Sequence, residues 1–296
     1  MSLLENKIAI VTGAGAGLGR AYALALAREG AALVVNDFAP ADASGVTPAE
    51  RVVREIEAEG GRAVASLANV ATVEGGQSLL EAALEAFGSV DILVNNAGIL
   101  RDASLAKMEE GQWDAVISVH LKGLFCVTKP IFGWMKDNGR GGVIVNTTSV
   151  VGLRGNFGQT NYSAAKGGVI GFSNSLALEG KKHGIRVWTI GPAAATALTD
   201  HMPDEYKRLF HVDRLGPSLV YMVSDLSGDQ TGKLLLAGGG WVGEARFEVH
   251  PGYTPSETFD VHELARAVAE GRVMFPERDA KFVTAYGPAK TEGQIV

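Results

Sequence analysis

Short apolar runs alternate along this chain with alanine- and leucine-rich segments of helical periodicity. The runs are Ile8–Thr12, Ala32–Asn36, Arg62–Ser66, Ile92–Asn95, Gly142–Thr147, Arg186–Ile190 and Lys233–Ala237. Helices are predicted between them, for example over Gly17–Glu29, Ala49–Glu59, Gly75–Phe87 and Tyr162–His183. Strands that are apolar throughout and alternate with helices form a parallel sheet covered on both faces. We therefore expect a single doubly wound α/β domain, which binds ligands at the carboxyl ends of its strands.

The composition changes near residue 243, so the α/β domain is predicted to span residues 1–243. Residues 244–296 contain four prolines and are expected to form an extension of irregular chain around one helix. That helix would begin at the N-cap Asp260, with Glu263 as its capping-box partner, and end at Gly271.

Charge and cysteine content exclude several classes of function. The net charge is −6 and the isoelectric point is about 5.6, whereas nucleic-acid binders usually present a basic face. Cys126 is the single cysteine, so neither an intramolecular disulfide nor a cysteine-rich metal site is possible, and no metal is expected. We find no secretory signal in residues 1–12 and no uncharged apolar stretch long enough to cross a membrane. A cytoplasmic protein without nucleic-acid or membrane partners is expected.

A glycine-rich loop, Thr12–Gly19, joins the first strand to the first helix in the pattern T-G-x-x-x-G-x-G. Glycines allow unusual backbone angles and close approach to a pyrophosphate, which the helix N-terminus then attracts. The pattern is not G-x-G-x-x-G, because Leu18 and Arg20 occupy the third glycine positions, and a glycine-rich turn without a ligand is the alternative. The loop predicts a Rossmann-like dinucleotide site formed by Gly13, Gly17, Leu18 and Gly19.

An aspartate at the end of the second strand indicates which dinucleotide binds. Asp37 lies 18 residues after Gly19, where a carboxylate accepts hydrogen bonds from the adenosine ribose and repels a 2′-phosphate. No lysine or arginine follows within residues 38–40. Asp37 could instead only cap the following turn. The sequence favours NAD over NADP.

Three residues suggest alcohol–ketone chemistry. Ser149 follows a predicted strand, and Tyr162 and Lys166 share one face of a predicted helix at i and i+4. A tyrosine with a pKa near 10 exchanges protons poorly at neutral pH, but a nearby ammonium and an oxidised nicotinamide would favour its phenolate. Ser149 could orient the substrate oxygen. Taken singly, each residue has an ordinary structural role; their combination after the glycine loop indicates an oxidoreductase.

On these motifs the chain resembles the short-chain dehydrogenase/reductase family over about residues 3–243. The shared residues are Thr12–Gly19, Asn95–Gly98, Ser149, Tyr162-x-x-x-Lys166 and Gly191-Pro192. The resemblance implies a nicotinamide cofactor contacted by Tyr162 and Lys166 and also by Asn96, Ala97, Gly98, Pro192 and Thr196. It further implies a homodimer or homotetramer.

Two positions depart from the usual family pattern. His120 stands where many members have an asparagine that holds a relay water, so it has a relay or site-shaping role or is a buried structural histidine. Asn69 replaces an aspartate near the adenine, where its amide can still bond the base beside Val70.

One branch of the family is especially similar: the (3R)-hydroxyacyl-CoA dehydrogenase part of peroxisomal multifunctional enzyme type 2 and its bacterial stand-alone relatives. The similarity is carried by Asn95–Asp102 and by Gly155–Gln159 leading to Asn161–Lys166. It implies interconversion of a 3-hydroxyacyl and a 3-oxoacyl thioester, with Asp200–His211 covering the acyl chain. The alternatives are a dehydrogenase of steroids or other bulky secondary alcohols and a non-catalytic NAD-sensing binding protein.

Overall fold

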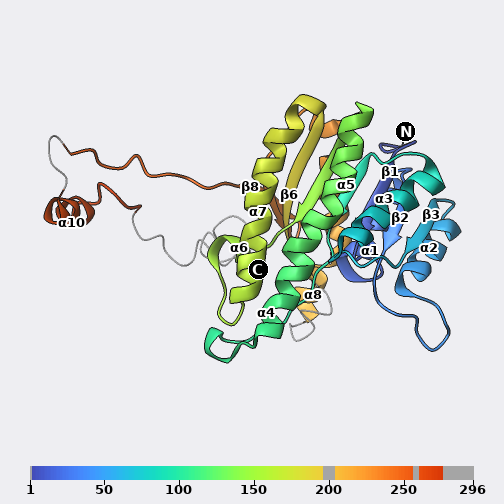
Figure 1. Cartoon of the computed structure of the whole chain (residues 1–296), viewed down its shortest axis with the longest axis horizontal. Helices are drawn as coiled ribbons and strands as arrows, with labels where there is room; N and C mark the ends of the chain where they lie inside the picture. Colours follow the sequence, from blue (N-terminus) through green and yellow to red (C-terminus); the bar gives the residue numbers. More distant parts are fainter. Residues whose placement is uncertain (1, 196–203, 256–259, 276–296) are drawn as a thin grey trace.

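An eight-stranded sheet forms the centre of the protein (Figure 1). The computed structural model describes residues 2–195, 204–255 and 260–275. The sheet order is β3-β2-β1-β4-β5-β6-β7-β8, in which the first seven strands are parallel and β8 is antiparallel to β7. The strands are β1 (Ile8–Thr12), β2 (Ala32–Asn36), β3 (Arg62–Ser66), β4 (Ile92–Asn95), β5 (Gly142–Thr147), β6 (Ile185–Ala193), β7 (Lys233–Gly238) and β8 (Trp241–Ala245). The predicted doubly wound α/β fold is confirmed.

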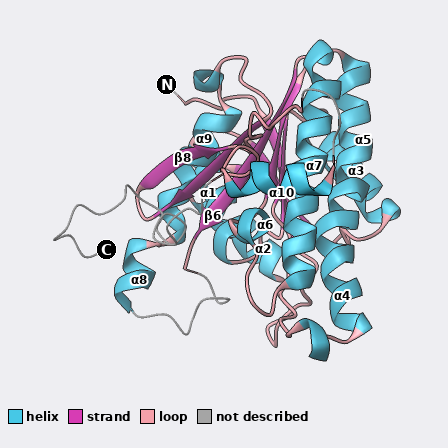
Figure 2. Ribbon diagram, turned by 90° about the vertical axis from the view of Figure 1, so that its left-hand side faces the viewer, coloured by secondary structure: helices cyan, strands magenta, loops and turns pink. Residues whose placement is uncertain are grey.

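Helices cover both faces of the sheet (Figure 2). They are α1 (Gly17–Arg28), α2 (Pro48–Ala58), α3 (Val73–Phe87), α4 (Glu110–Ile117), α5 (Gly123–Asn138), α6 (Val151–Arg154), α7 (Thr160–Gly180), α8 (Asp204–Leu209), α9 (Gly216–Val223) and α10 (Val261–Ala269). Residues of α1, α2 and α9 pack in one buried cluster and those of α3, α5 and α7 in the other. Alternate residues of β1 enter the two clusters, Ala9 the first and Ile10 the second, because strand side chains point to opposite faces.

One helical run among the described residues, Glu110–Asn138, is long and apolar enough to cross a membrane by length and composition alone. It comprises α4, a π-helical turn (Ser118–Lys122) and α5. In this fold its residues Ile131 and Met135 are fully buried in the core cluster that also contains Leu79 of α3. Core helices pass the same test of length and composition, so the run is weak evidence for a membrane span.

The predicted boundary at residue 243 falls inside strand β8, which the sequence analysis did not anticipate. Beyond β8 an arm leaves the sheet and carries α10 away from it (Figure 1). Asp260 caps α10 as predicted, since its Oδ1 accepts hydrogen bonds from the backbone N–H groups of His262 and Glu263 at 2.7 and 2.9 Å. The Glu263 carboxylate accepts a hydrogen bond from the Tyr253 hydroxyl at 2.6 Å.

Candidate active site

The glycine loop between β1 and α1 is too tightly packed to hold side chains. A Cβ on Gly13 would lie 2.7 Å from the Cα of Ala97, and one on Gly19 would lie 2.0 Å from the carbonyl oxygen of Gly13. Gly13 and Gly17 also have positive φ angles of 62° and 53°. The N-cap Ala16 supplies no side-chain hydrogen bond to the first turn of α1. The loop therefore offers a close backbone cradle and a helix N-terminus, which suit a pyrophosphate.

Asp37 is fixed beside this loop at the carboxyl end of β2. Its Oδ2 accepts a hydrogen bond from the backbone N–H of Gly15 at 2.9 Å, and its Oδ1 accepts one from the backbone N–H of Ala39 at 2.9 Å. The second bond is the turn cap considered above, and the first ties the carboxylate to the glycine loop. Cap and loop contact therefore coexist, and the carboxylate lies where the adenosine ribose of a dinucleotide is expected.

The segment after β4 is hydrogen-bonded to the glycine loop and supports it. The Thr12 hydroxyl oxygen accepts hydrogen bonds from the backbone N–H groups of Asn96 and Ala97 at 3.0 and 3.1 Å. The Asn96 side chain donates to the carbonyl oxygens of Thr12 and Gly13 at 3.0 and 3.2 Å. Asn96 thus holds the conformation of the glycine loop.

The remaining predicted cofactor residues lie at other strand ends. Asn69 follows β3, and its Oδ1 accepts a hydrogen bond from the backbone N–H of Ala71 at 3.0 Å. Val70 is buried and lines a small cavity, which is also lined by Lys166. Pro192 lies in β6 beside Ala237 of β7. Thr196, predicted to contact the nicotinamide carboxamide, lies outside the described residues.

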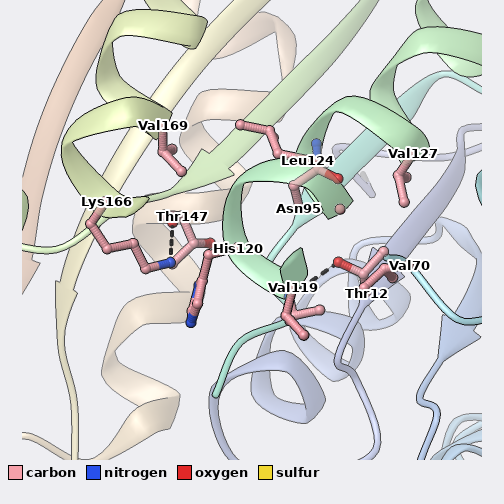
Figure 3. A pocket seen from close by; sticks show the side chains of 12 residues that line it. Thr12, Val70, Asn95, Val119, His120, Leu124, Val127, Thr147, Lys166 and Val169 are labelled. Carbon is pink, nitrogen blue, oxygen red and sulfur yellow. Dashed lines mark hydrogen bonds between the residues drawn. The ribbon is translucent and has the colours of Figure 1, made fainter. Parts of the chain in front are cut away.

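Ser149, Tyr162 and Lys166 meet at the carboxyl end of β5. Lys166 is buried in α7, and its Nζ donates a hydrogen bond to the Thr147 carbonyl oxygen at 2.7 Å (Figure 3). The same Nζ lies 5.6 Å from the ring centroid of Tyr162. The Ser149 side chain lies close enough to the Tyr162 hydroxyl to lower its pKa by hydrogen bonding. The arrangement brings a hydroxyl donor, a phenol and an amine to one point beside the glycine loop.

Burial dominates the acid–base properties of this group. It raises the pKa of Tyr162, with the hydrogen bond from Ser149 opposing the shift and the Asp102 carboxylate adding to it. Burial also lowers the pKa of Lys166 to about 7. The predicted lowering of the Tyr162 pKa is therefore not a property of the protein alone. Desolvation of the phenolate exceeds what a lysine that is itself desolvated can offset.

His120 lies in the π-helical turn, a kind of irregularity that often occurs at functional sites. Its Nε2 lies 3.0 Å from the backbone N–H nitrogen and 2.8 Å from the carbonyl oxygen of Ile99, and its ring meets the Tyr162 ring edge-on at 5.2 Å. A Cβ on Gly98 would lie 2.3 Å from His120 Cε1, so this glycine makes room for the imidazole. Burial, aided by the charge of Lys166, lowers the pKa of His120 to about 3. A neutral imidazole that shapes the site fits this environment better than a relay through imidazolium.

The buried imidazole should make the fold sensitive to acid. Because the pKa of His120 in the folded protein, about 3, is below the usual 6.5, the unfolded chain takes up this proton first as the pH falls. Stability is therefore lost from about pH 6.5 downward, by about 2 kcal/mol between pH 7 and pH 5. We expect His120→Asn to remove about this part of the pH dependence in urea unfolding measured at both pH values. The exposed His262→Asn is the control; equal acid losses in His120→Asn and the wild type would contradict the assignment.

A polar network runs through the middle of the sheet. The resemblance implies that Asn95–Gly98 stabilises the sheet centre, but the sequence analysis missed the continuation of the network through Asn146 and Ser173. The Asn95 side chain donates to Asn146 Oδ1 at 2.9 Å, and the fully buried Asn146 donates in turn to Ser173 Oγ of α7 at 2.9 Å. Thr147, whose carbonyl oxygen binds Lys166, is the next residue of β5. An asparagine inside an otherwise apolar strand was the available signal, because buried amides are retained only with partners.

This fold and site define a nicotinamide-dependent oxidoreductase that acts on CH–OH groups. The family model for the short chain dehydrogenases matches residues 7–207, and the chain belongs to that family. The site residues Ser149, Tyr162 and Lys166 all lie within the matched region.

Multifunctional peroxisomal enzymes and a mycobacterial dehydrogenase are similar to this chain. The peroxisomal hydratase-dehydrogenase-epimerase of Neurospora crassa is 44% identical over 84% of the chain, and the peroxisomal multifunctional enzyme type 2 of Mus musculus is 41% identical over 82%. The chain spans only 27% and 33% of the lengths of these two proteins. The crystal structure of a short chain dehydrogenase from Mycobacterium avium is 38% identical, has a TM-score of 0.83, and covers 93% of this chain and 98% of its own.

Proposed function

We propose that this protein is an NAD-dependent dehydrogenase that interconverts (3R)-3-hydroxyacyl-CoA and 3-oxoacyl-CoA. The reaction class is supported by one observation above all, the convergence of Ser149, Tyr162 and Lys166 beside the glycine loop. The substrate class is supported by similarity, over more than four fifths of the chain, to a peroxisomal enzyme named as both a hydratase and a dehydrogenase.

In the oxidation direction the Tyr162 hydroxyl group, once ionised, removes the proton of the substrate alcohol. Ser149 donates a hydrogen bond to the same substrate oxygen and fixes its position. Lys166, anchored on the Thr147 carbonyl oxygen, can bind ribose hydroxyls and stabilise the phenolate when it is protonated. A bound nicotinamide would supply the hydride acceptor. In the reduction direction Tyr162 returns the proton to the carbonyl oxygen.

The preference for NAD over NADP is proposed from Asp37. Its carboxylate is held against the backbone N–H of Gly15, so it cannot swing away from a 2′-phosphate without breaking that 2.9 Å hydrogen bond. The Asp37 carboxylate and the 2′-phosphate of a bound NADP would both be negative and would repel each other. The same carboxylate can accept hydrogen bonds from both ribose hydroxyls of NAD.

The segment expected to cover the acyl chain is described from Asp204 onward, so Met202 lies outside the described residues. The rings of Tyr206 and Phe210 stack with centroids 4.3 Å apart. Phe210 is buried, and a Cβ on Gly239 would lie 3.1 Å from its ring, so Phe210 packs against the β7–β8 turn. Within the described part of this segment, Tyr206 is thus the better candidate for acyl contact.

One assay tests the proposal. The purified protein is given NAD or NADP with (3R)- and (3S)-3-hydroxyacyl-CoAs of several chain lengths and with hydroxysteroids, and NADH or NADPH formation is recorded. We expect turnover with the (3R)-thioesters and NAD. Turnover of steroids alone would establish the bulky-alcohol dehydrogenase instead, and NAD binding without turnover of any alcohol would establish an NAD-sensing protein.

We also propose a homodimer or homotetramer in the cytoplasm. Large apolar side chains are exposed on the helices outside the sheet, including Trp113 of α4, Phe125 of α5 and Leu178 of α7, which is 79% exposed. Apolar surface of this kind is commonly covered by a second subunit. Light scattering during size-exclusion chromatography gives the molar mass, and a monomer at micromolar concentration would contradict this part of the proposal.

A further inference from the structure

The loop after β4 is fastened to the start of the catalytic helix by contacts between residues far apart in the sequence. The fully buried Asn161 donates hydrogen bonds to the carbonyl oxygens of Arg101 and Gln112 at 2.9 and 3.2 Å. Its own Oδ1 accepts a hydrogen bond from the backbone N–H of Tyr162 at 2.7 Å. The position of Tyr162 therefore depends on this loop.

A carboxylate belongs to the same connection. Gln159 Nε2 donates a hydrogen bond to Asp102 Oδ2 at 2.8 Å, and Gln159 Oε1 accepts one from the Asn156 side chain at 2.9 Å. The backbone N–H of Ala103 donates to the Gly158 carbonyl oxygen at 2.9 Å. Gln159 is only 9% exposed, so its amide has little freedom to turn away. We call the Asp102–Gln159 pair, with the Ala103–Gly158 bond, the carboxylate latch.

The carboxylate latch holds the negative charge of Asp102 close to the start of α7, where the Tyr162 hydroxyl must ionise before it can accept a proton from the substrate. Gln159 is the N-cap residue of α7 and lies three residues before Tyr162, so the two residues are about one helical turn apart. The charge of Asp102 acts on Tyr162 and disfavours its ionised form. The other polar groups around the phenol are Lys166 of α7, the neutral His120 of the π-helical turn and the hydroxyl of Ser149. Asp102 is thus the one acid among the described groups around this phenol.

We propose that Asp102 is a positioning residue whose carboxylate, held by Gln159 about one helical turn before Tyr162, sets the pH range in which the enzyme oxidises its alcohol substrate. Keeping the phenol protonated to higher pH favours proton donation to a ketone near neutral pH. The inference rests on the proposed acid–base role of Tyr162, but it is independent of which alcohol is the substrate.

The test compares Asp102→Asn with the wild type. Asparagine keeps an oxygen for the Gln159 amide and removes the charge. The phenolate of Tyr162 is titrated by ultraviolet difference absorbance against Tyr162→Phe, and kcat/KM for oxidation is measured over the same pH range. At pH values below both midpoints we expect about two- to fivefold more phenolate and a similar rise in kcat/KM, the size expected for an exposed carboxylate. High salt should reduce the difference.

Two further variants make the test decisive. Asp137→Asn removes the same net charge at the end of α5 and should leave both pH profiles in place. Gln159→Met keeps the carboxylate but releases it, and should shift the profiles in the same direction by a smaller amount. Superimposable titration curves for Asp102→Asn and the wild type would overturn the proposal. A shift in the titration without turnover of any alcohol would support the latch and contradict the proposed function instead.

Discussion

Tyr162→Phe is expected to lower kcat for alcohol oxidation by about three orders of magnitude, within the range found when a general acid–base group is removed. The substitution removes one oxygen atom. The ring can keep its edge-on contact with His120 at 5.2 Å and its place above the Lys166 ammonium at 5.6 Å. Cofactor binding and folding should therefore change little, and the loss should appear in kcat.

Three measurements separate chemistry from structure in this variant. Initial rates give kcat, quenching of protein fluorescence gives the NADH dissociation constant, and circular dichroism gives Tm. Tyr221→Phe is the matched control, because it removes a hydroxyl that accepts a hydrogen bond from Gln230 at 3.2 Å far along the chain from the site. A Tyr162→Phe enzyme that retains more than about a tenth of the wild-type kcat would show that another group transfers the proton.

The strand pattern could be predicted from the sequence because most of the sheet is buried on both faces. The run Ala32–Asn36 is buried at every position and apolar up to Val35, and few alternatives compete with a parallel sheet for such a run. The added strand β8 was missed although a signal existed. Gly239 and Gly240 have φ angles of 58° and 83°, as a two-residue hairpin turn requires, and two glycines between apolar runs are typical of such turns.

The site was predictable where chemistry is local and not where it depends on tertiary contacts. Tyr162 and Lys166 are one helical turn apart, so their spacing alone brings them together. Gln159 and Asp102 are 57 positions apart, and only the finished fold shows that they meet. The direction of the Tyr162 pKa shift was likewise beyond the sequence, because it depends on how much water the fold excludes.

The second large effect is expected at the glycine loop, from Gly19→Ala. The added Cβ would lie 2.0 Å from the carbonyl oxygen of Gly13 and 2.6 Å from Nδ2 of Asn96. The Gly13 oxygen is part of the glycine loop, and Asn96 is the residue that supports this loop. Neither atom can move aside without spreading the loop. A spread loop would no longer point its backbone N–H groups at the pyrophosphate. The loss of two such hydrogen bonds to a charged group would weaken NADH binding at least about 100-fold. Tm should also fall.

A second glycine in the first turn of a helix provides the control. Gly111 of α4 is exposed, and apart from its chain neighbours and its own helix backbone no atom lies within 4 Å of where its Cβ would be. Alanine is favoured over glycine in a helix by about 1 kcal/mol, so Gly111→Ala should leave NADH binding unchanged and raise Tm slightly. The two identical substitutions are thus expected to change Tm in opposite directions. If Gly19→Ala bound NADH as tightly as Gly111→Ala does, the pyrophosphate would not lie on this loop, and the assignment of the cofactor site would be wrong.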